Sequence, residues 1–354
     1  MNQITKKQHY VPRCLLRHFA SNDKVSVFDS EREAVRHNRH IKEEFAENYL
    51  YDTDNAVENL LAKIEDNVAP LIARYAEGSI DNSSKMSPEL ARFVAVQLAR
   101  TPGARSEMLD LVDKFTSRLI QQIGELNDLQ TENIKLELKN PNVILVRHVL
   151  DAIVFLWHLV ADLRPHLLVN KTSVPFVLSD HPIVHYNWYL KDSADPEKTG
   201  IPAAGIQIFL PISNKVTLCL YDSKVYKIGE RDQPSTELGN DLDIELLNSL
   251  QAMNRERLVV FGDISSETYV RRLCCANARM SLHVGESKAS EPVPTGKDNL
   301  SSSLEVWRTQ RAVNSWLSVV KIRRDARRNR GEFRYRQPEV VARIDMARER
   351  LKRE

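Results

Sequence analysis

The stretch NVILVRHVLDAIVFLWHLVADLRPHLLVN, residues 142–170, contains the change of pattern that decides the fold class. Its first part, up to Leu163, is largely apolar and predicts a long buried helix. The ionisable side chains of Arg147 and Asp151 interrupt the apolar run, and their cost in a bilayer excludes a transmembrane helix. After Pro165 short apolar runs bounded by turn residues follow, which is the pattern of β-strands. The chain therefore passes from a helical part to a sheet within this stretch.

Upstream of this point, residues 55–163 show apolar positions at helical spacing. The run over residues 57–75 predicts the first helix. Ser87-Pro88 supplies the N-cap and the first-turn proline of the next helix, which stops near Thr101. The remaining helices of this block are expected over residues 108–123, 128–139 and 142–163.

Downstream, residues 165–280 carry the expected sheet. The strands are expected over residues 167–169, 175–178, 206–210, 216–221 and 258–261, with helices over 241–255 and 266–276. A polar insertion at residues 188–204 predicts a surface loop. The sequence therefore predicts an α+β fold, mixed α/β in content, in which a central helical block, residues 55–163, packs on a small mixed or antiparallel sheet. Residues 1–285 form a single domain in this interpretation.

The C-terminal part differs in composition. Residues 286–303 are rich in Ser, Pro and Gly and predict a flexible linker. Residues 304–354 contain fifteen Lys or Arg against seven Asp or Glu, a net charge of +8, which leaves −6 for residues 1–303 because the whole chain carries +2. We therefore expect a separate basic helical tail.

The tail suggests a nucleic-acid partner. One face of an amphipathic helix is expected to carry Val306, Val313, Leu317 and Val320. The basic residues that follow it are Arg323, Arg324, Arg327, Arg328 and Arg330. Arginine-rich segments bind nucleic acid by neutralising phosphates, and Phe333 and Tyr335 offer rings on which bases stack. The alternative is a solvated helix that packs back on the acidic remainder of the chain.

The overall composition is that of an ordinary globular protein, with 42% hydrophobic and 28% charged residues. The polar N-terminus lacks the apolar segment of an export signal, so we expect a cytoplasmic protein outside the membrane. Four cysteines without a CxxC pair show no zinc-site spacing. The GxSxG, GxxxxGK(S/T), GxGxxG and HExxH signatures do not occur, which removes the commonest hydrolase-elbow, P-loop, dinucleotide and zincin interpretations.

Short motifs occur in an order typical of one known family. They are QHYVP at 8–12, LRHF at 16–19, QLARTP at 97–102, SDHP at 179–182 and FLPIS at 209–213, followed by Asn248. On these residues the chain resembles the bacterial family catalogued as domain of unknown function 4238, over residues 3–262 and not in the basic tail. The resemblance implies which residues to inspect and implies no particular activity.

Two polar residues lie on an apolar helix face. Gln97 and Arg100 fall at the same helical intervals as Leu90 and Phe93. A buried arginine needs a partner, which is either an internal carboxylate, a set of carbonyls at the helix end, or an anionic substrate that it clamps.

Other candidate residues lie at strand ends and next to prolines. Asp180 follows a strand, where it could act as a base or metal ligand or simply form a turn before the next proline. His181 and His185 would share one face of a strand, but two ligands do not predict a metal site, so a divalent metal cofactor stays open. His9 beside Tyr10 could serve as a general base with a hydroxyl donor, or as a buried histidine bonded to the chain.

Two functional hypotheses follow. In the first, the chain is a hydrolase, a nuclease or another enzyme that processes phosphodiesters or nucleotides, with a defence- or toxin-like role. Its expected catalytic residues are His9, Tyr10, Gln97, Arg100 and Asp180, and its expected substrate-binding residues are Arg13, Arg17, Thr101 and Asn248. Nucleic acid or a nucleotide would bind through Arg100 and the basic tail. In the second hypothesis these residues are structural, and the chain is a non-catalytic module that binds a nucleotide or a protein.

Overall fold

The computed structural model describes residues 6–51, 55–80, 86–127, 139–193, 195, 198–230, 233–278, 280–289, 293–294, 300–301 and 304–351. Its helices are α1 Arg13–Leu16, α2 Ala56–Ala76, α3 Pro88–Ala99, α4 Pro102–Asn127, α5 Asn142–Val154, α6 Asp241–Asn254, α7 Glu267–Ala276, α8 Arg324–Arg327 and α9 Pro338–Leu351. Helix α3 begins as expected, because Ser87 Oγ accepts a hydrogen bond from the Leu90 amide at 3.2 Å. The expected helix over residues 128–139 lies almost entirely outside the described residues.

The helix expected over residues 142–163 is shorter than its apolar pattern. Helix α5 ends at Val154, and a 3₁₀ turn follows at Leu156–Leu159. In this turn the guanidinium of Arg92, from α3, lies 4.4 Å from the centre of the Trp157 ring. This tertiary contact favours the tighter turn over continuation of the helix.

Two sheets carry the β-structure. One has the order β11-β5-β9-β8-β7, in which only the β11–β5 pair is parallel. The other is antiparallel with the order β3-β2-β12-β6. The strands are β2 Lys24–Asp29, β3 Ala34–His40, β5 Arg164–Asn170, β6 Leu178–Ser179, β7 Val184–Tyr186, β8 Gln207–Pro211, β9 Val216–Tyr221, β11 Ser235–Leu238 and β12 Leu258–Phe261. The expectation of one sheet is therefore wrong, because β6 and β12 pair with each other and β12 pairs with the N-terminal β2.

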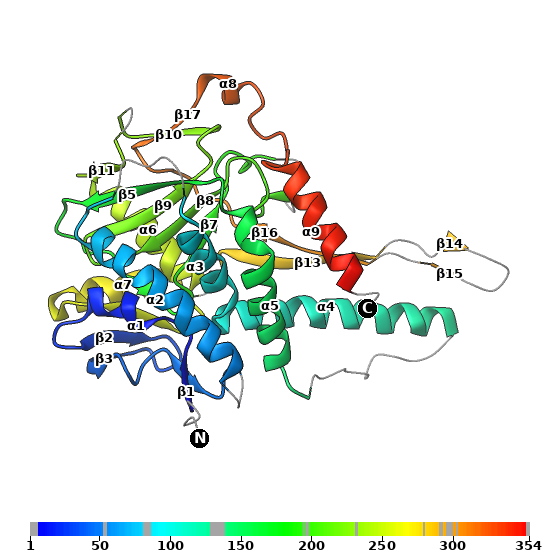
Figure 1. The fold of residues 1–354 in the computed structure, drawn as a ribbon, viewed down its shortest axis with the longest axis horizontal. Coiled ribbons are helices and arrows are strands. Elements are labelled where there is room, and N and C mark those ends of the chain that lie inside the picture. Colours follow the sequence, from blue (N-terminus) through cyan, green and yellow to red (C-terminus); the bar gives the residue numbers. More distant parts are fainter. Residues whose placement is uncertain are drawn as a thin grey trace.

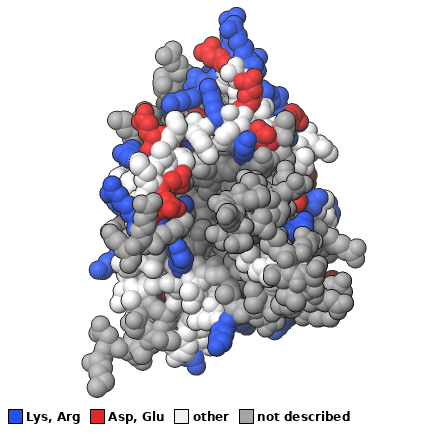
Figure 2. All heavy atoms as spheres, turned by 90° about the vertical axis from the view of Figure 1, so that its right-hand side faces the viewer, with Lys and Arg blue, Asp and Glu red and all other residues white. Residues whose placement is uncertain are grey.

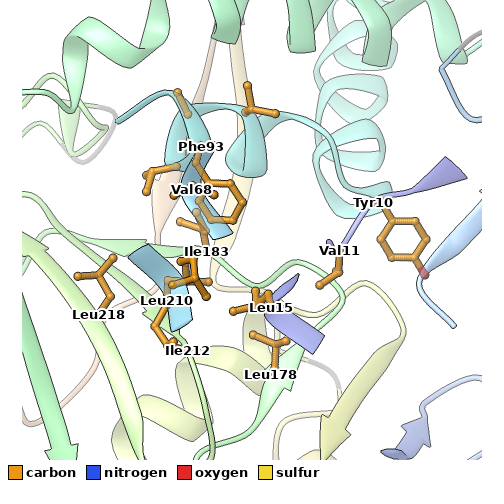
Figure 3. Packing of buried hydrophobic residues seen from close by; sticks show 14 of the residues in the cluster. Tyr10, Val11, Leu15, Val68, Phe93, Leu178, Ile183, Leu210, Ile212 and Leu218 are labelled. Atoms are coloured by element: carbon orange, nitrogen blue, oxygen red, sulfur yellow. The ribbon is translucent and has the colours of Figure 1, made fainter. Parts of the chain in front are cut away.

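The five-stranded sheet is covered on both faces. Along β8, Ile208 and Leu210 point into a core shared with α2, α3 and α5, whereas Phe209 points into a second core shared with α6. This alternation is the two-residue period of a strand. Figure 3 shows Leu210 and Leu218 of the sheet meeting Val68 and Phe93 of the helical block. Helix α7 covers the other sheet (Figure 1). The fold is a mixed α+β fold, as expected.

The C-terminal segment departs from the expected linker and tail. Four short strand pairs complete the structure: β1 Lys7–His9 with β4 Ala46–Asn48, β10 Tyr226–Ile228 with β17 Val320–Ile322, β13 His283–Ala289 with β16 Leu304–Gln310, and β14 Val293–Pro294 with β15 Leu300–Ser301. The prediction of an amphipathic helix from Val306 to Val320 is wrong, because residues 304–310 form strand β16 and pair with β13. Part of the expected linker is thus strand, and the rest of it lies outside the described residues.

The basic segment is part of the fold. Leu317 is 2% exposed in the core on the α6 face of the sheet, and Ala326 of α8 is buried there too. Ser318 Oγ donates a hydrogen bond to Asp243 Oδ2 on α6 at 2.5 Å. Long-range pairing and burial therefore override the helical pattern that the sequence shows here. No described helix is both long enough and apolar enough to cross a bilayer.

Candidate functional site

Gln97 and Arg100 belong to a buried hydrogen-bond network. Gln97 Nε2 donates to the Tyr10 carbonyl at 2.8 Å, and Arg100 Nε donates to Gln97 Oε1 at 2.7 Å. Arg100 Nη1 lies 2.6 Å from Glu65 Oε1, and the Tyr51 hydroxyl donates to the Arg100 carbonyl at 3.1 Å. Arg100 is only 1% exposed. Its anion partner is therefore the internal carboxylate of Glu65, and the expected role as a substrate clamp is not supported by this geometry.

His9 lies at the edge of the same network. Its Nε2 is 3.3 Å from the Ile41 carbonyl, and burial lowers its pKa. Arg13 is close enough to lower the pKa of His9 further, and Arg17 is exposed on the surface. None of these three side chains lines the cavities described below. These three side chains therefore lie outside the cavities, although His9 stays near Arg100.

Asp180 fixes the start of β12. Its Oδ1 accepts a hydrogen bond from the Glu256 amide at 2.9 Å, and its Oδ2 accepts from the amides of Arg257 and Leu258 at 2.8 and 2.7 Å. Burial raises the pKa of this carboxyl to about 6, against the opposing effect of the three amide donors. The carboxylate thus holds the backbone at the start of β12, and it also lines a cavity.

Tyr10 and Asp180 meet in a cavity of about 550 Å³, which we call the charged cavity. Burial and then the charge of Asp180 raise the pKa of Tyr10 well above its ordinary value. The cations of the charged cavity have carboxylate partners, and the shortest N–O distances are 3.0 Å for Arg36–Glu44, 2.6 Å for Arg39–Glu44, 3.1 Å for Arg105–Glu47 and 2.7 Å for Arg257–Asp29, with Lys7 paired to Glu43. Because these cations are paired with carboxylates, the charged cavity has little unpaired charge with which to attract a ligand.

A row of amides on α6 holds the SDHP turn. Asn248 Oδ1 accepts from the Val177 amide at 3.1 Å, and its Nδ2 donates to the Pro175 carbonyl at 2.9 Å. Asn254 Nδ2 donates to the His181 carbonyl at 2.6 Å. Asn248 is 1% exposed, so it positions the backbone and does not have the access that a substrate-binding residue needs.

The SDHP and QLARTP motifs touch at a second cavity. The Thr101 hydroxyl is hydrogen-bonded to His181 Nδ1, and Gly103 lies against the His181 ring, where an added Cβ would stand 3.0 Å from Cγ. The cavity measures about 290 Å³ and lies between α4, the end of α6 and the β13–β16 pair. We call it the histidine cavity. Its lining includes the side chains of Ser106, Glu107, His181, Glu256, His283 and Arg308.

Burial controls the protonation of these groups. It lowers the pKa of His181 to about 3 and the pKa of His283 well below its ordinary value. His185 stacks on His283 with ring centres 4.2 Å apart, and burial lowers its pKa to about 4. Burial raises the pKa of Glu107. At neutral pH the cavity therefore presents uncharged imidazoles beside a carboxyl whose pKa burial raises and the charge of Arg308 lowers.

Arg308 has unused hydrogen-bonding capacity. Its Nη2 lies 3.1 Å from Glu107 Oε1, whereas its Nε and Nη1 are buried and have no partner in the described part of the chain. A buried N–H without an acceptor costs about 1–3 kcal/mol. In the histidine cavity Arg308 lies among the carboxylates of Glu107, Asp110 and Glu256. Among the described residues, no group of three or more His, Cys, Asp and Glu side chains has an arrangement that could hold a metal ion.

The arginines of the C-terminal segment have mixed environments. Arg323 Nε donates to the carbonyls of Ser223 and Tyr226 at 2.7 and 3.0 Å, and Arg330 lies 3.8 Å from Asp192. The expected nucleic-acid residues Arg324, Arg327 and Arg328 are exposed on the surface. Figure 2 shows Lys and Arg at the top of the molecule, at the height of α8 in Figure 1, with Asp and Glu among them. This surface is charged but not uniformly basic.

A model of the family described as protein of unknown function DUF4238 matches residues 7–265. The chain belongs to this family. Neither a curated protein nor a solved structure matches it. All the residues that line the charged cavity lie within the matched region, whereas the histidine cavity also takes His283 and Arg308 from beyond it.

Sequence reasoning missed the residues that carry the histidine cavity. Glu107 and Arg308 are separated by about two hundred positions and lie in no recognisable motif, so no sequence signal links them. His181 was considered only as half of a metal pair with His185. A signal was present in Gly103, which directly follows the QLARTP motif and allows the close approach of the His181 ring.

Proposed function

We propose that this chain is a hydrolase that cleaves a phosphoester bond of a nucleotide or nucleic acid in the histidine cavity. The observation that carries the proposal is the partly buried guanidinium of Arg308, whose Nε and Nη1 have no partner among the described residues, in a cavity with uncharged imidazoles. Arginine matches the geometry of phosphate oxygens through parallel N–H donors. Proton acceptors beside an anion-binding group are what phosphoester hydrolysis requires.

Four side chains of the histidine cavity have different roles in the proposed reaction. Arg308 holds the phosphoryl oxygens and stabilises the charge that grows on them. The imidazole of His283 takes a proton from an attacking water as the water oxygen forms a bond to phosphorus. As the bond from phosphorus to the leaving oxygen breaks, Glu107 gives a proton to that oxygen; burial raises the pKa of this carboxyl, and the charge of Arg308 acts in the opposite direction. His181 is held by Thr101 and positions the wall of the cavity.

Arg308→Gln tests this function, with Arg311→Gln as its matched control. Arg311 is an exposed arginine three positions away whose Nε donates to the Ser281 carbonyl at 3.1 Å. Single-stranded DNA, single-stranded RNA and bis(4-nitrophenyl) phosphate are offered as substrates. We expect Arg308→Gln to lower kcat/KM about 100-fold, as loss of an oxyanion donor does. Arg311→Gln is expected to retain the wild-type value.

Thermal melts of both variants separate lost chemistry from lost folding, and growth of cells that express each variant tests the defence- or toxin-like role. Absence of turnover of all three substrates by the folded wild-type chain contradicts the proposal. Equal activity of wild type and Arg308→Gln contradicts the assignment of the histidine cavity.

A second candidate is a binding module for a nucleotide or protein. It is supported by the hydrogen bonds of Gln97, Arg100, Asp180 and Asn248, which all end on the chain itself. Under this proposal an oligonucleotide binds the wild-type chain without being cleaved, and Arg308→Gln weakens that binding. Titration with a fluorescent single-stranded oligonucleotide, followed by analysis of its length, distinguishes the two candidates.

A further inference from the structure

A third cavity lies at the edge where the C-terminal segment meets the five-stranded sheet. It measures about 410 Å³. Its lining comes from the first residue of β5, the last residue of β9, strand β10, the loop after β10 and the residue that follows β17. We call it the basic cavity, and its charged and polar side chains are Arg164, Tyr221, Lys227, Glu230, Gln233 and Arg323. Strands β10 and β17, which border it, lie in the upper part of Figure 1.

The cations of the basic cavity differ from those of the charged cavity in having no carboxylate partner. In the described part of the chain, neither Arg164 nor Lys227 forms an ion pair. Arg323 uses its Nε on the carbonyls of Ser223 and Tyr226, which leaves its two terminal nitrogens for other contacts. Among the described residues of the lining, three cations against the carboxylate of Glu230 give a net charge of +2.

Tyr221 adds a hydroxyl donor among these charges. It is 3% exposed, and its ring packs edge-on against His166 with the ring centres 6.2 Å apart. Burial raises the pKa of Tyr221, and the charges of Arg164 and Arg323 oppose that rise. Arg164, Arg323 and Tyr221 line the same cavity, so the three groups supply N–H and O–H donors around one space.

We propose that the basic cavity binds a phosphate monoester of a small organic molecule, such as a mononucleotide. Two guanidiniums, an ammonium and a phenol suit a dianionic phosphate, because charge-assisted and bidentate hydrogen bonds are the strong ones. A volume of about 410 Å³ leaves room for an organic part beyond the phosphate. Ile228 and the amide of Gln233 are placed to contact that part. This site is separate from the histidine cavity and shares no lining residue with it.

Isothermal titration of the full chain with AMP, inorganic phosphate and adenosine tests the site. We expect AMP to bind, inorganic phosphate to bind more weakly, and adenosine not to bind. Arg164→Gln and Lys227→Gln should each weaken AMP binding at least about tenfold, which is the size of one lost charge-assisted hydrogen bond. The matched control is Arg324→Gln, which removes an exposed arginine next to Arg323 that does not line the basic cavity.

Four outcomes decide the matter. Selective loss in the two cavity variants supports the proposal, and retention of AMP binding by Arg308→Gln places the ligand outside the histidine cavity. Equal loss in Arg324→Gln shows only non-specific attraction to a basic surface and overturns the proposal. Failure of the wild-type chain to bind AMP or phosphate overturns it as well. Melting curves of each variant confirm that the chain titrated is folded.

Discussion

Gln251 holds the SDHP turn with both ends of its amide. Its Oε1 accepts hydrogen bonds from the amide and hydroxyl of Ser179 at 3.0 and 2.9 Å, and its Nε2 donates to the Pro182 carbonyl at 2.7 Å. The side chain is 2% exposed, so no water can replace these bonds. The position of His181 in the histidine cavity therefore depends on Gln251, an uncharged residue of helix α6.

Gln251→Leu should lower the free energy of unfolding of the chain and weaken the binding of a ligand in the histidine cavity. The leucine leaves buried donors and an acceptor without partners, at a cost of about 1–3 kcal/mol each. We expect the free energy of unfolding to fall by about 3 kcal/mol in urea titrations. Glu245→Gln, at a partly exposed position of the same helix that forms a 3.8 Å surface ion pair with Arg272, should change it by less than about 1 kcal/mol. A Gln251→Leu variant as stable as wild type would refute the role of this amide.

Gly205 is required by both its backbone and its surroundings. Its φ is +80°, and an added Cβ would lie 2.3 Å from Tyr189 Cβ. Gly205→Ala therefore combines the cost of a left-handed residue with a steric clash, for a total of about 2–5 kcal/mol. Gly78 provides the control, since its φ is +77° and nothing lies within 4 Å of an added Cβ.

Urea unfolding of Gly78→Ala should show a loss of only about 1–2 kcal/mol. If both alanine variants lose the same amount, the contact of residue 205 with Tyr189 contributes nothing and the backbone alone explains the effect.

At the scale of elements, β7, the SDHP turn and β13 bring His185, His181 and His283 together. Their pKa values in the folded chain are about 4, about 3 and well below 6.5, because burial disfavours the charged form. Unfolding exposes them, so between about pH 4 and 6.5 these three histidines bind more protons in the unfolded chain than in the folded chain. Stability contributed by these groups is present above pH 6.5 and is lost as the pH falls toward 4.

Melting temperature measured from pH 8 to pH 4 should therefore fall steeply below pH 6.5. Each histidine contributes at most about 1.4 kcal/mol per pH unit within this window. His283→Gln should reduce the slope, and His40→Gln, on the outer strand β3 of the other sheet, should leave it unchanged. A slope that is the same in all three chains would show that acid acts through other groups.

At the scale of the whole molecule, the C-terminal segment completes the fold. Leu317 and the partly buried Trp316 pack in the core on the α6 face of the sheet, and Trp316 stacks on Trp188 with ring centres 5.3 Å apart. Strand β17 pairs with β10, and β16 pairs with β13. The first and last parts of the sequence thus share one structure, in place of the domain, linker and tail that the sequence predicted.

Truncation tests this arrangement. A chain that ends at residue 303 loses the contacts of Leu317 and Trp316, each worth about 1.5–3 kcal/mol of buried apolar surface. Its melting temperature should fall by about 10 °C or more in calorimetry, or the chain should aggregate. A chain that ends at residue 337 keeps those contacts and should melt much closer to wild type. Equal melting of the full chain and the 303-residue chain would restore the idea of an independent tail.

Local patterns accounted for much of the architecture. Ser87-Pro88 defined the start of α3 because capping acts over a few residues, and the short apolar run at residues 206–210 indicated a strand. The apolar run at 142–163 predicted a helix longer than α5. The helix ends early because Trp157 contacts Arg92, and such a tertiary contact cannot be read from a local pattern. Of the five residues expected in one cleft, Tyr10 and Asp180 line the charged cavity, and His9, Gln97 and Arg100 do not.

By itself, the sequence determined the mixed α+β class, the family motifs and most helices, because these depend on capping, periodicity and composition within short windows. Only the tertiary structure decided which charges are paired and which stay available. Arg100 meets Glu65 and Arg308 meets Glu107 across long separations in the chain, and an ion pair depends on distances of a few ångströms that no local pattern encodes. For that reason the cavities with unused donors, and with them the proposed chemistry, were visible only in the folded chain.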